Sequence, residues 1–80
     1  MFGTGEPMVI SPEESKAARK LLRWSQQHVA TRLQVSEQTV RRFEIGERLP
    51  WSLDLTQLRR LYEEAGVEFT QGGPKLKRGR

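Results

Sequence analysis

The chain has 80 residues, a net charge of +4 and no cysteine, which limits it to one small domain without disulfides or thiolate metal sites. A single histidine cannot form a histidine cluster, so we expect no metal and no cofactor. No apolar run is long enough for a signal peptide or a membrane span, which predicts a cytoplasmic protein without membrane association. The excess positive charge comes from Lys75, Lys77, Arg78 and Arg80, because the rest of the chain has as many acidic as basic residues. The charge alone is therefore a weak argument for a polyanionic partner.

The N-terminal part predicts a flexible leader followed by a helix. Glycine, threonine and proline without periodicity make residues 1–10 the leader. Ser11 is the expected N-cap, Pro12 takes the first helical position, and Glu14 completes a capping box. We expect the helix to end at Trp24, a core residue, and to bury one apolar face made of Ala17, Ala18, Leu21 and Leu22.

The segment from Ser25 to Gly46 predicts two short helices joined by a tight turn. Ser25 and Ser36 each precede a run with apolar residues at helical spacing and are the expected N-caps. Gly46 ends the second run, because glycine readily adopts the left-handed conformation at a helix C-terminus. The connection around Gln34 leaves room for a turn of only a few residues, which is the spacing of a helix-turn-helix.

The second of these helices, residues 37–45, has an outward face suited to reading DNA. Val40 and Phe43 point inward, which turns the polar residues Glu37, Gln38, Arg41 and Arg42 outward. Arginine and glutamine can each make two hydrogen bonds to a guanine or adenine edge, and a carboxylate can accept from cytosine. Glu37 has a second interpretation, as a cap of its own helix N-terminus.

The C-terminal part predicts a fourth helix and a short strand. Leu49 and Trp51 are expected to anchor a loop, after which Ser52 caps a helix over residues 53–65. Gly66 ends that helix, and the alternation of Val67 to Thr70 predicts a strand that pairs with residues 8–10 or with a second chain. Residues 71–80 predict a disordered basic tail, which leaves residues 11–70 as the folded domain.

From about Ala17 to Ala65 the sequence resembles the Xre/Cro/C1-type helix-turn-helix domains, which have the lambda-repressor-like fold. The matching string is ARKLLRWSQQHVATRLQVSEQTVRRFEIGERLP. The resemblance implies an all-α bundle of four to five helices, here with a short C-terminal strand. It also implies that Arg19 and Glu44 form an ion pair. The DNA-binding residues that it implies are Gln26 on the DNA backbone, Ser36, Glu37, Gln38 and Arg42 along base edges, and Arg41 and Arg48 near phosphates.

Two positions depart from the family pattern. Gln34 occupies a turn position that is often glycine, and a non-glycine residue in the left-handed conformation costs about 1 kcal/mol. The fifth helix that often serves dimerisation has no counterpart beyond Val67 to Thr70. The resemblance therefore implies DNA binding more directly than it implies a way of dimerising.

Two classes of function remain open at this point. The first is a sequence-specific regulator of transcription, a repressor, that binds double-stranded DNA as a homodimer through helix 37–45. The second is a protein-interaction module, such as an antitoxin or accessory subunit, whose protein partner contacts Leu49, Trp51, Val67 and Phe69. We do not expect an enzyme, because one histidine and no cysteine provide no recognisable catalytic constellation.

Overall fold

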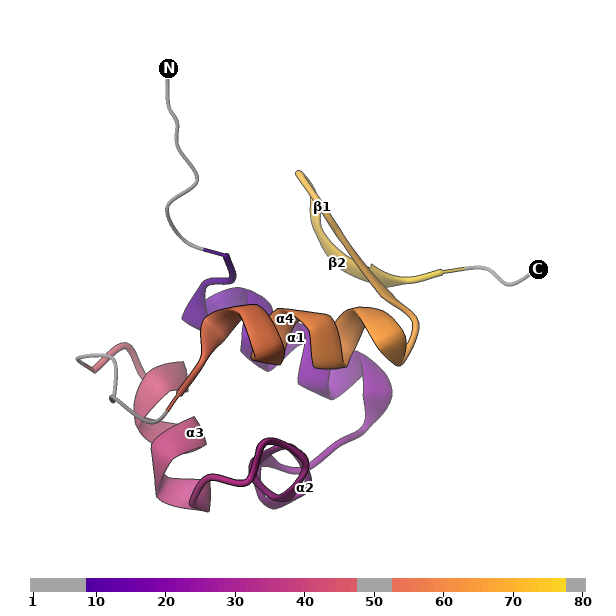
Figure 1. Cartoon of the computed structure of the whole chain (residues 1–80). Coiled ribbons are helices and arrows are strands. Elements are labelled where there is room, and N and C mark those ends of the chain that lie inside the picture. The colour runs from indigo at the N-terminus through magenta and orange to yellow at the C-terminus, as the bar shows by residue number, and fades with distance from the viewer. Residues whose placement is uncertain (1–8, 48–52, 78–80) are drawn as a thin grey trace.

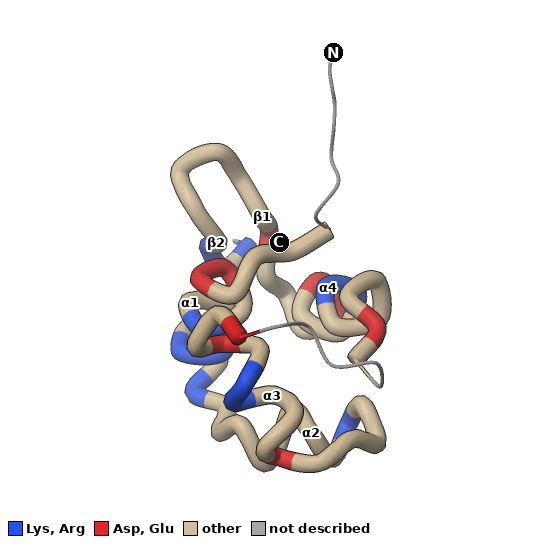
Figure 2. The backbone as a smooth tube through the Cα atoms, turned by 90° about the vertical axis from the view of Figure 1, so that its left-hand side faces the viewer, with Lys and Arg blue, Asp and Glu red and all other residues tan. Residues whose placement is uncertain are grey.

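The structure is a computed structural model that describes residues 9–47 and 53–77. Its elements are α1 (Pro12–Leu22), α2 (Gln26–Leu33), α3 (Glu37–Glu44), α4 (Leu55–Glu64), β1 (Val67–Thr70) and β2 (Gly73–Leu76). Helices α2 and α3 lie below α1 and α4, and the β1–β2 hairpin projects from the opposite side (Figures 1 and 2). The predicted helix-turn-helix bundle with a short C-terminal strand is confirmed.

The start of α1 follows the capping box expected from the sequence. The Ser11 hydroxyl accepts a hydrogen bond from the Glu14 amide at 3.0 Å, and the Glu14 carboxylate accepts one from the Ser11 amide at 2.9 Å. The predicted end at Trp24 was wrong. Arg23 adopts a left-handed conformation with φ 60°, so α1 stops at Leu22 and Trp24 begins the connection to α2.

The buried face of α1 also differs from the prediction. Ser15 and Ala18 are fully buried and Leu22 is half-buried, whereas Leu21 is exposed. The face is rotated because Ser15 hydrogen-bonds to side chains of both α3 and α4. The apolar pattern alone did not include Ser15, because a hydroxyl is buried in a core only where other groups form hydrogen bonds with it.

The turn between α2 and α3 has the predicted geometry. Ser25 and Ser36 are the N-caps of the two helices, and their hydroxyls accept from the amides of His28 and Thr39. Gln34 is left-handed, with φ 61° and ψ 42°. Gly46, with φ 87°, follows the end of α3 as expected. These caps and turns are local, which is why the sequence predicted them correctly.

Helix α4 begins later than predicted. Its N-cap is Asp54, whose carboxylate accepts from the amides of Thr56 at 2.9 Å and Gln57 at 3.3 Å. The predicted cap Ser52 lies outside the described residues, as do the loop anchors Leu49 and Trp51. A carboxylate is as good a cap as a hydroxyl, and here it stands two residues nearer the helix.

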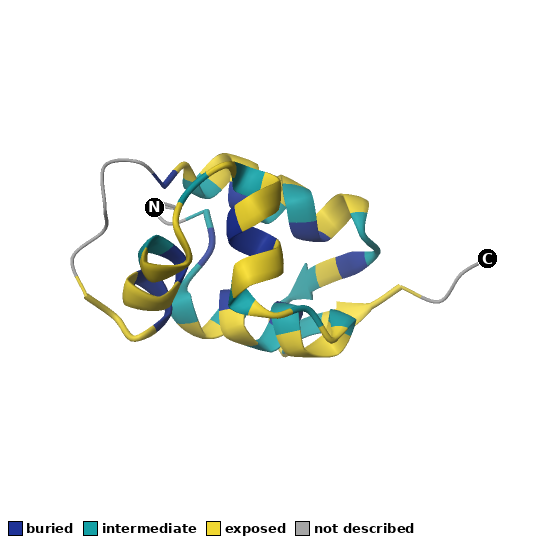
Figure 3. Ribbon diagram, turned by 90° about the horizontal axis from the view of Figure 1, so that it is seen from below, coloured by how far each residue is buried: buried dark blue, intermediate teal, exposed yellow. Residues whose placement is uncertain are grey.

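The core joins all four helices, the strand β1 and the residue before Ser11 (Figure 3). Its buried members are Ile10, Ala18, Val29, Ala30, Val40, Phe43, Leu53, Leu58, Tyr62 and Val67. The prediction of a leader up to residue 10 was therefore wrong for Ile10, which is fully buried. Ala30 of α2 lies in the same core as Val40 of α3, and its small side chain lets the two helices approach closely.

The strand β1 is confirmed, but its predicted pairing was wrong. It pairs antiparallel with β2, with Val67 opposite Leu76 and Thr70 opposite Gly73. The prediction of a disordered tail from residue 71 is therefore wrong for Gly73–Leu76. Gly73, with φ 114°, shapes the turn, and the Thr70 hydroxyl donates to the Gly73 carbonyl at 2.7 Å. Pro74 argued against a strand, but an edge strand tolerates the missing N–H group.

Candidate nucleic-acid interface

The outward face of α3 is exposed as predicted. Val40 and Phe43 are buried, at 1% and 3% exposure, and fix the rotation of the helix. Its polar residues, which we call the α3 face, are all exposed: Glu37, Gln38, Arg41 and Arg42. The Arg42 guanidinium lies 3.7 Å from the Glu47 carboxylate, and both side chains are more than half exposed. Such a surface pair contributes little free energy, so Arg42 can exchange it for another partner.

Ser36 holds the start of α3. Its hydroxyl accepts from the Thr39 amide at 3.1 Å and lies 2.8 Å from the Thr39 hydroxyl. Ser36 is thus the N-cap of α3. The Glu37 carboxylate stays in the first turn, where its charge complements the helix dipole. The cap makes the backbone at the N-terminal end of the α3 face well defined.

The start of α2 can receive a phosphate. The N–H groups of Gln26 and Gln27 precede the first hydrogen bond within the helix, which the Val29 amide donates to the Ser25 carbonyl. The first turn of α2 has no acidic residue, in contrast to that of α1. Exposed N–H groups at the positive end of a helix dipole favour an anion.

The Gln26 side chain is half-buried and bound within the protein. Its amide nitrogen donates to the Glu44 carboxylate at 3.1 Å, which links the start of α2 to the end of α3. Sequence reasoning placed Gln26 against the DNA backbone and did not predict this bond. The bond uses an amide N–H and fixes the direction of the side chain at the edge of the α2 N-terminus.

Glu44 is the centre of a buried polar cluster, the Glu44 network, that joins α1, α2, α3 and α4. The guanidinium of Arg19 donates twice to the carboxylate, from Nη2 at 2.8 Å and from Nε at 3.0 Å, and donates a third time to the Trp24 carbonyl at 3.1 Å. The Glu44 side chain is fully buried and that of Arg19 is 13% exposed. This is the ion pair that the family resemblance implied, and it is confirmed. The members of the network are Ser15, Arg19, Gln26, Glu44 and Tyr62.

The direction of each hydrogen bond in the network follows from the proton count. A hydroxyl has one proton, and Ser15 donates its proton to the Glu44 carboxylate at 3.1 Å. The Tyr62 hydroxyl, 3.0 Å from that of Ser15, must therefore be the donor to Ser15. The chain of donors runs from α4 through α1 to α3, and it requires Tyr62 to be neutral and Glu44 to be ionised.

The pKa values agree with these charge states. Burial is the largest influence on Glu44 and raises the pKa of its carboxyl, but the hydrogen bonds from Arg19, Gln26 and Ser15 together lower it below the ordinary value. The hydrogen bond to Glu44 raises the pKa of Arg19. Burial also raises the pKa of Tyr62 to about 12. At neutral pH the network is therefore a charged pair with a neutral phenol.

The network supports the interface mechanically. Helix α3 has eight residues, too few to be stable alone in water. Val40 and Phe43 fix its rotation, and Glu44 ties its last turn to α1 and to the first residue of α2. The α3 face and the α2 N-terminus are therefore held as one rigid unit. Sequence reasoning missed Ser15 and Tyr62, although Ser15 stands three residues before the buried Ala18, a spacing that indicates the same helix face.

Other residues named from the sequence lie elsewhere. Arg48 is outside the described residues, as are Leu49 and Trp51. Val67 is buried in the core, and Phe69 packs within the domain, with its ring centroid 6.4 Å from that of Tyr62. The predicted protein-contact surface was therefore wrong for Val67, because the core buries it, whereas Phe69 is half-buried.

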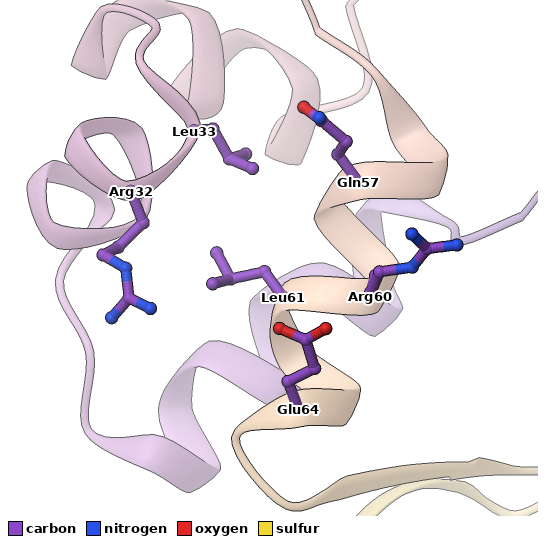
Figure 4. A pocket seen from close by; sticks show the side chains of 6 residues that line it. All are labelled: Arg32, Leu33, Gln57, Arg60, Leu61 and Glu64. Atoms are coloured by element: carbon purple, nitrogen blue, oxygen red, sulfur yellow. The ribbon is translucent and has the colours of Figure 1, made fainter.

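A solvent-open hollow of about 270 Å³ separates α2 from α4. Leu33 and Leu61 point into it, and the Arg60 side chain points away from it (Figure 4). The guanidinium groups of Arg32 and Arg60 do not converge, so the hollow lacks the paired cations of an anion site.

Comparison with known proteins gives one result for this chain. A family model described as helix-turn-helix matches residues 16–63, which include most of α1, all of α2 and α3, and most of α4. No curated protein matches the sequence significantly. Within residues 9–47 and 53–77, no helix has the length and apolar character of a membrane span.

Proposed function

The chain belongs to the Xre/Cro/C1-type helix-turn-helix family, a family of DNA-binding regulators, and we propose that it is a sequence-specific transcriptional repressor that reads the major groove with α3. A protein that covers the DNA to which the polymerase must bind blocks transcription by steric exclusion. Repression therefore needs no contact surface beyond the DNA-binding unit.

The observation that carries the proposal is the exposed α3 face on a helix whose other face is locked into the core. Arg42 and Gln38 are the side chains best suited to reading base edges, because each can make two hydrogen bonds to one base. Arg41 would bind phosphate, and Glu37 would accept from cytosine. Ser36 supports the reading by capping the helix.

The start of α2 would set the position of the domain on the DNA backbone. Its N–H groups, assisted by the oriented Gln26 side chain, would bind one phosphate beside the groove that α3 enters. Two copies would then read a pseudo-palindromic site with half-sites about one helical turn, roughly 10 bp, apart.

The test is a selection of bound sequences from duplex DNA with a random central region, at about physiological salt. We expect a two-fold-symmetric motif with the wild-type protein. With Arg42→Ala, discrimination at one position in each half-site should fall by about tenfold or more, as for the loss of one arginine–guanine contact. The matched control is Arg60→Ala, which removes an exposed arginine from α4 and should leave the motif unchanged.

Two results would contradict the proposal. If no motif is enriched, α3 does not read sequence. If Arg42→Ala and Arg60→Ala weaken binding equally at every position, the arginines act only through their charge. An enriched motif without two-fold symmetry would retain sequence reading and reject the homodimer.

A further inference from the structure

We propose that an exposed basic flank of α1 extends the DNA contact beyond the helix-turn-helix and binds backbone phosphates next to the site that α3 reads. The flank consists of Lys16, Lys20 and Arg23. This inference rests on the proposed function, because it concerns DNA bound by the same face of the domain. It is independent of sequence reading by α3.

The three residues form one stripe. They lie at positions i, i+4 and i+7 of α1 and its C-cap, a spacing that places side chains on one side of a helix. All three are exposed, and none forms an ion pair with any residue that the structure describes. The exposed acid on this part of α1 is Glu13, one turn before Lys16.

The direction of Arg19 shows which way the stripe faces. Arg19 reaches Glu44 at the end of α3 and the Trp24 carbonyl just before α2, so its side of α1 faces the helix-turn-helix. Lys16 precedes Arg19 by three residues, so it lies beside it on the helix surface, and Arg23 is the C-cap directly after the last turn of α1. They form the solvent edge of the side of α1 that faces the candidate interface.

The views of the fold agree with this placement. Basic positions along α1 lead down toward α2 and α3, while β2 lies on the other side of α1 (Figure 2). Arg23 is also separated from the α2 N-terminus only by Trp24 and Ser25. If one phosphate binds at that N-terminus, the adjacent phosphate of the same DNA strand would therefore lie close to the end of α1.

The same placement separates Lys75 and Lys77 from the candidate interface. The hairpin projects from the side of the domain opposite α2 and α3 (Figure 1). Lys75 and Lys77 are exposed there, away from DNA bound to the α3 face. The cations that add affinity on the DNA side are those of α1, although the sequence concentrates its excess charge at the C-terminal end.

The experiment compares two variants that each remove three positive charges. The first is Lys16→Gln, Lys20→Gln and Arg23→Gln. The second is the matched control, Arg60→Gln, Lys75→Gln and Lys77→Gln, which takes its charges from α4 and the hairpin. Both are measured by fluorescence anisotropy against a pool of 30-bp duplexes of random sequence and against the duplex enriched in the selection, at salt concentrations from 50 to 200 mM.

The expected result is a loss of salt dependence confined to the α1 variant. Each phosphate contact contributes about 0.9 to the slope of log affinity against log salt concentration, so three contacts should lower the slope by about 2.7 for each protomer bound. Over a fourfold range of salt this corresponds to roughly a 40-fold smaller change in affinity. The loss should be the same on both probes, and the control should change the slope by less than 1.

A third variant, Lys16→Arg, Lys20→Arg and Arg23→Lys, keeps the charges and should bind as the wild-type protein does. Circular dichroism checks that all three variants fold. Three results would overturn the inference. The slope could fall equally in the α1 variant and the control, or affinity could fall equally in the charge-removing and charge-keeping variants. The wild-type protein could also bind while the α1 variant keeps the same slope. Failure of the wild-type protein to bind either probe would instead reject the proposed function.

Discussion

Replacing Glu44 with glutamine tests whether the buried network holds the interface together. The substitution keeps the size of the side chain and removes its charge. The carboxylate now accepts two hydrogen bonds from Arg19, one from Gln26 and one from Ser15. A glutamine offers one acceptor oxygen in their place and turns an amide N–H toward groups that are themselves donors.

The size of the loss follows from the burial of the pair. Removing one partner of a buried ion pair costs about 3–5 kcal/mol. The Arg19 side chain is 13% exposed and can recover some contact with water, which favours the lower end of that range, about 3 kcal/mol. A domain of this size has a total unfolding free energy of roughly 4–12 kcal/mol. Glu44→Gln should therefore remove a large fraction of the stability.

Urea denaturation followed by circular dichroism at pH 7 measures the change. The chain contains a matched control, because Arg59 and Glu63 form an ion pair with the same 2.8 Å separation in which the side chains are 34% and 45% exposed. Glu63→Gln should lower the unfolding free energy by no more than about 0.5 kcal/mol. A loss below about 1 kcal/mol for Glu44→Gln, or equal losses in the two variants, would refute the reasoning that burial makes the Glu44 pair matter.

Three further predictions concern pH and the turn. In acid, stability should fall as pH drops below 4.5, the ordinary pKa of glutamate, and through the lowered pKa of Glu44. The reason is that the Glu44 carboxylate takes up its proton in the unfolded chain before it does so in the folded protein. Urea titrations should therefore show a smaller loss of unfolding free energy in acid for Glu44→Gln. In alkali, stability should fall by about 3 kcal/mol between pH 10 and about 12, because the pKa of Tyr62 is raised and the unfolded chain loses its proton first. Tyr62→Phe should lack this loss, although it is less stable at pH 7. Gln34→Gly should raise the unfolding free energy by about 0.5 kcal/mol, because relief of the left-handed strain exceeds the added freedom of the unfolded chain. A lower melting temperature than that of the wild-type protein in thermal denaturation would contradict this.

The candidate interface could be predicted in its main parts because its signals are local. Caps depend on residues within one helical turn, so Ser25 and Ser36 marked the starts of α2 and α3 correctly. The spacing of Val40 and Phe43 fixed which side chains of α3 point outward. The ion pair between Arg19 and Glu44 came from the family resemblance rather than from the spacing.

The fourth helix and the C-terminal end show where local signals compete. Ser52 and Asp54 are both good caps, and the sequence offered no reason to prefer the second. The glycines, the proline and the basic residues of 71–80 favoured disorder, so no second strand was predicted there. The strand β2 forms because Val67 and Phe69 pack on the domain and position β1 to pair with it.

The sequence by itself determined the helix-turn-helix, because capping, helical periodicity and the tight turn act between residues close in the chain. Only the tertiary structure decided that Ser15 and Tyr62 join the Glu44 network, that Ile10 belongs to the core, and that Lys75 and Lys77 lie away from the candidate interface. These features depend on contacts between residues as far apart as Ser15 and Tyr62, whose hydroxyls meet at 3.0 Å. A local pattern has no information about such contacts until the helices have packed.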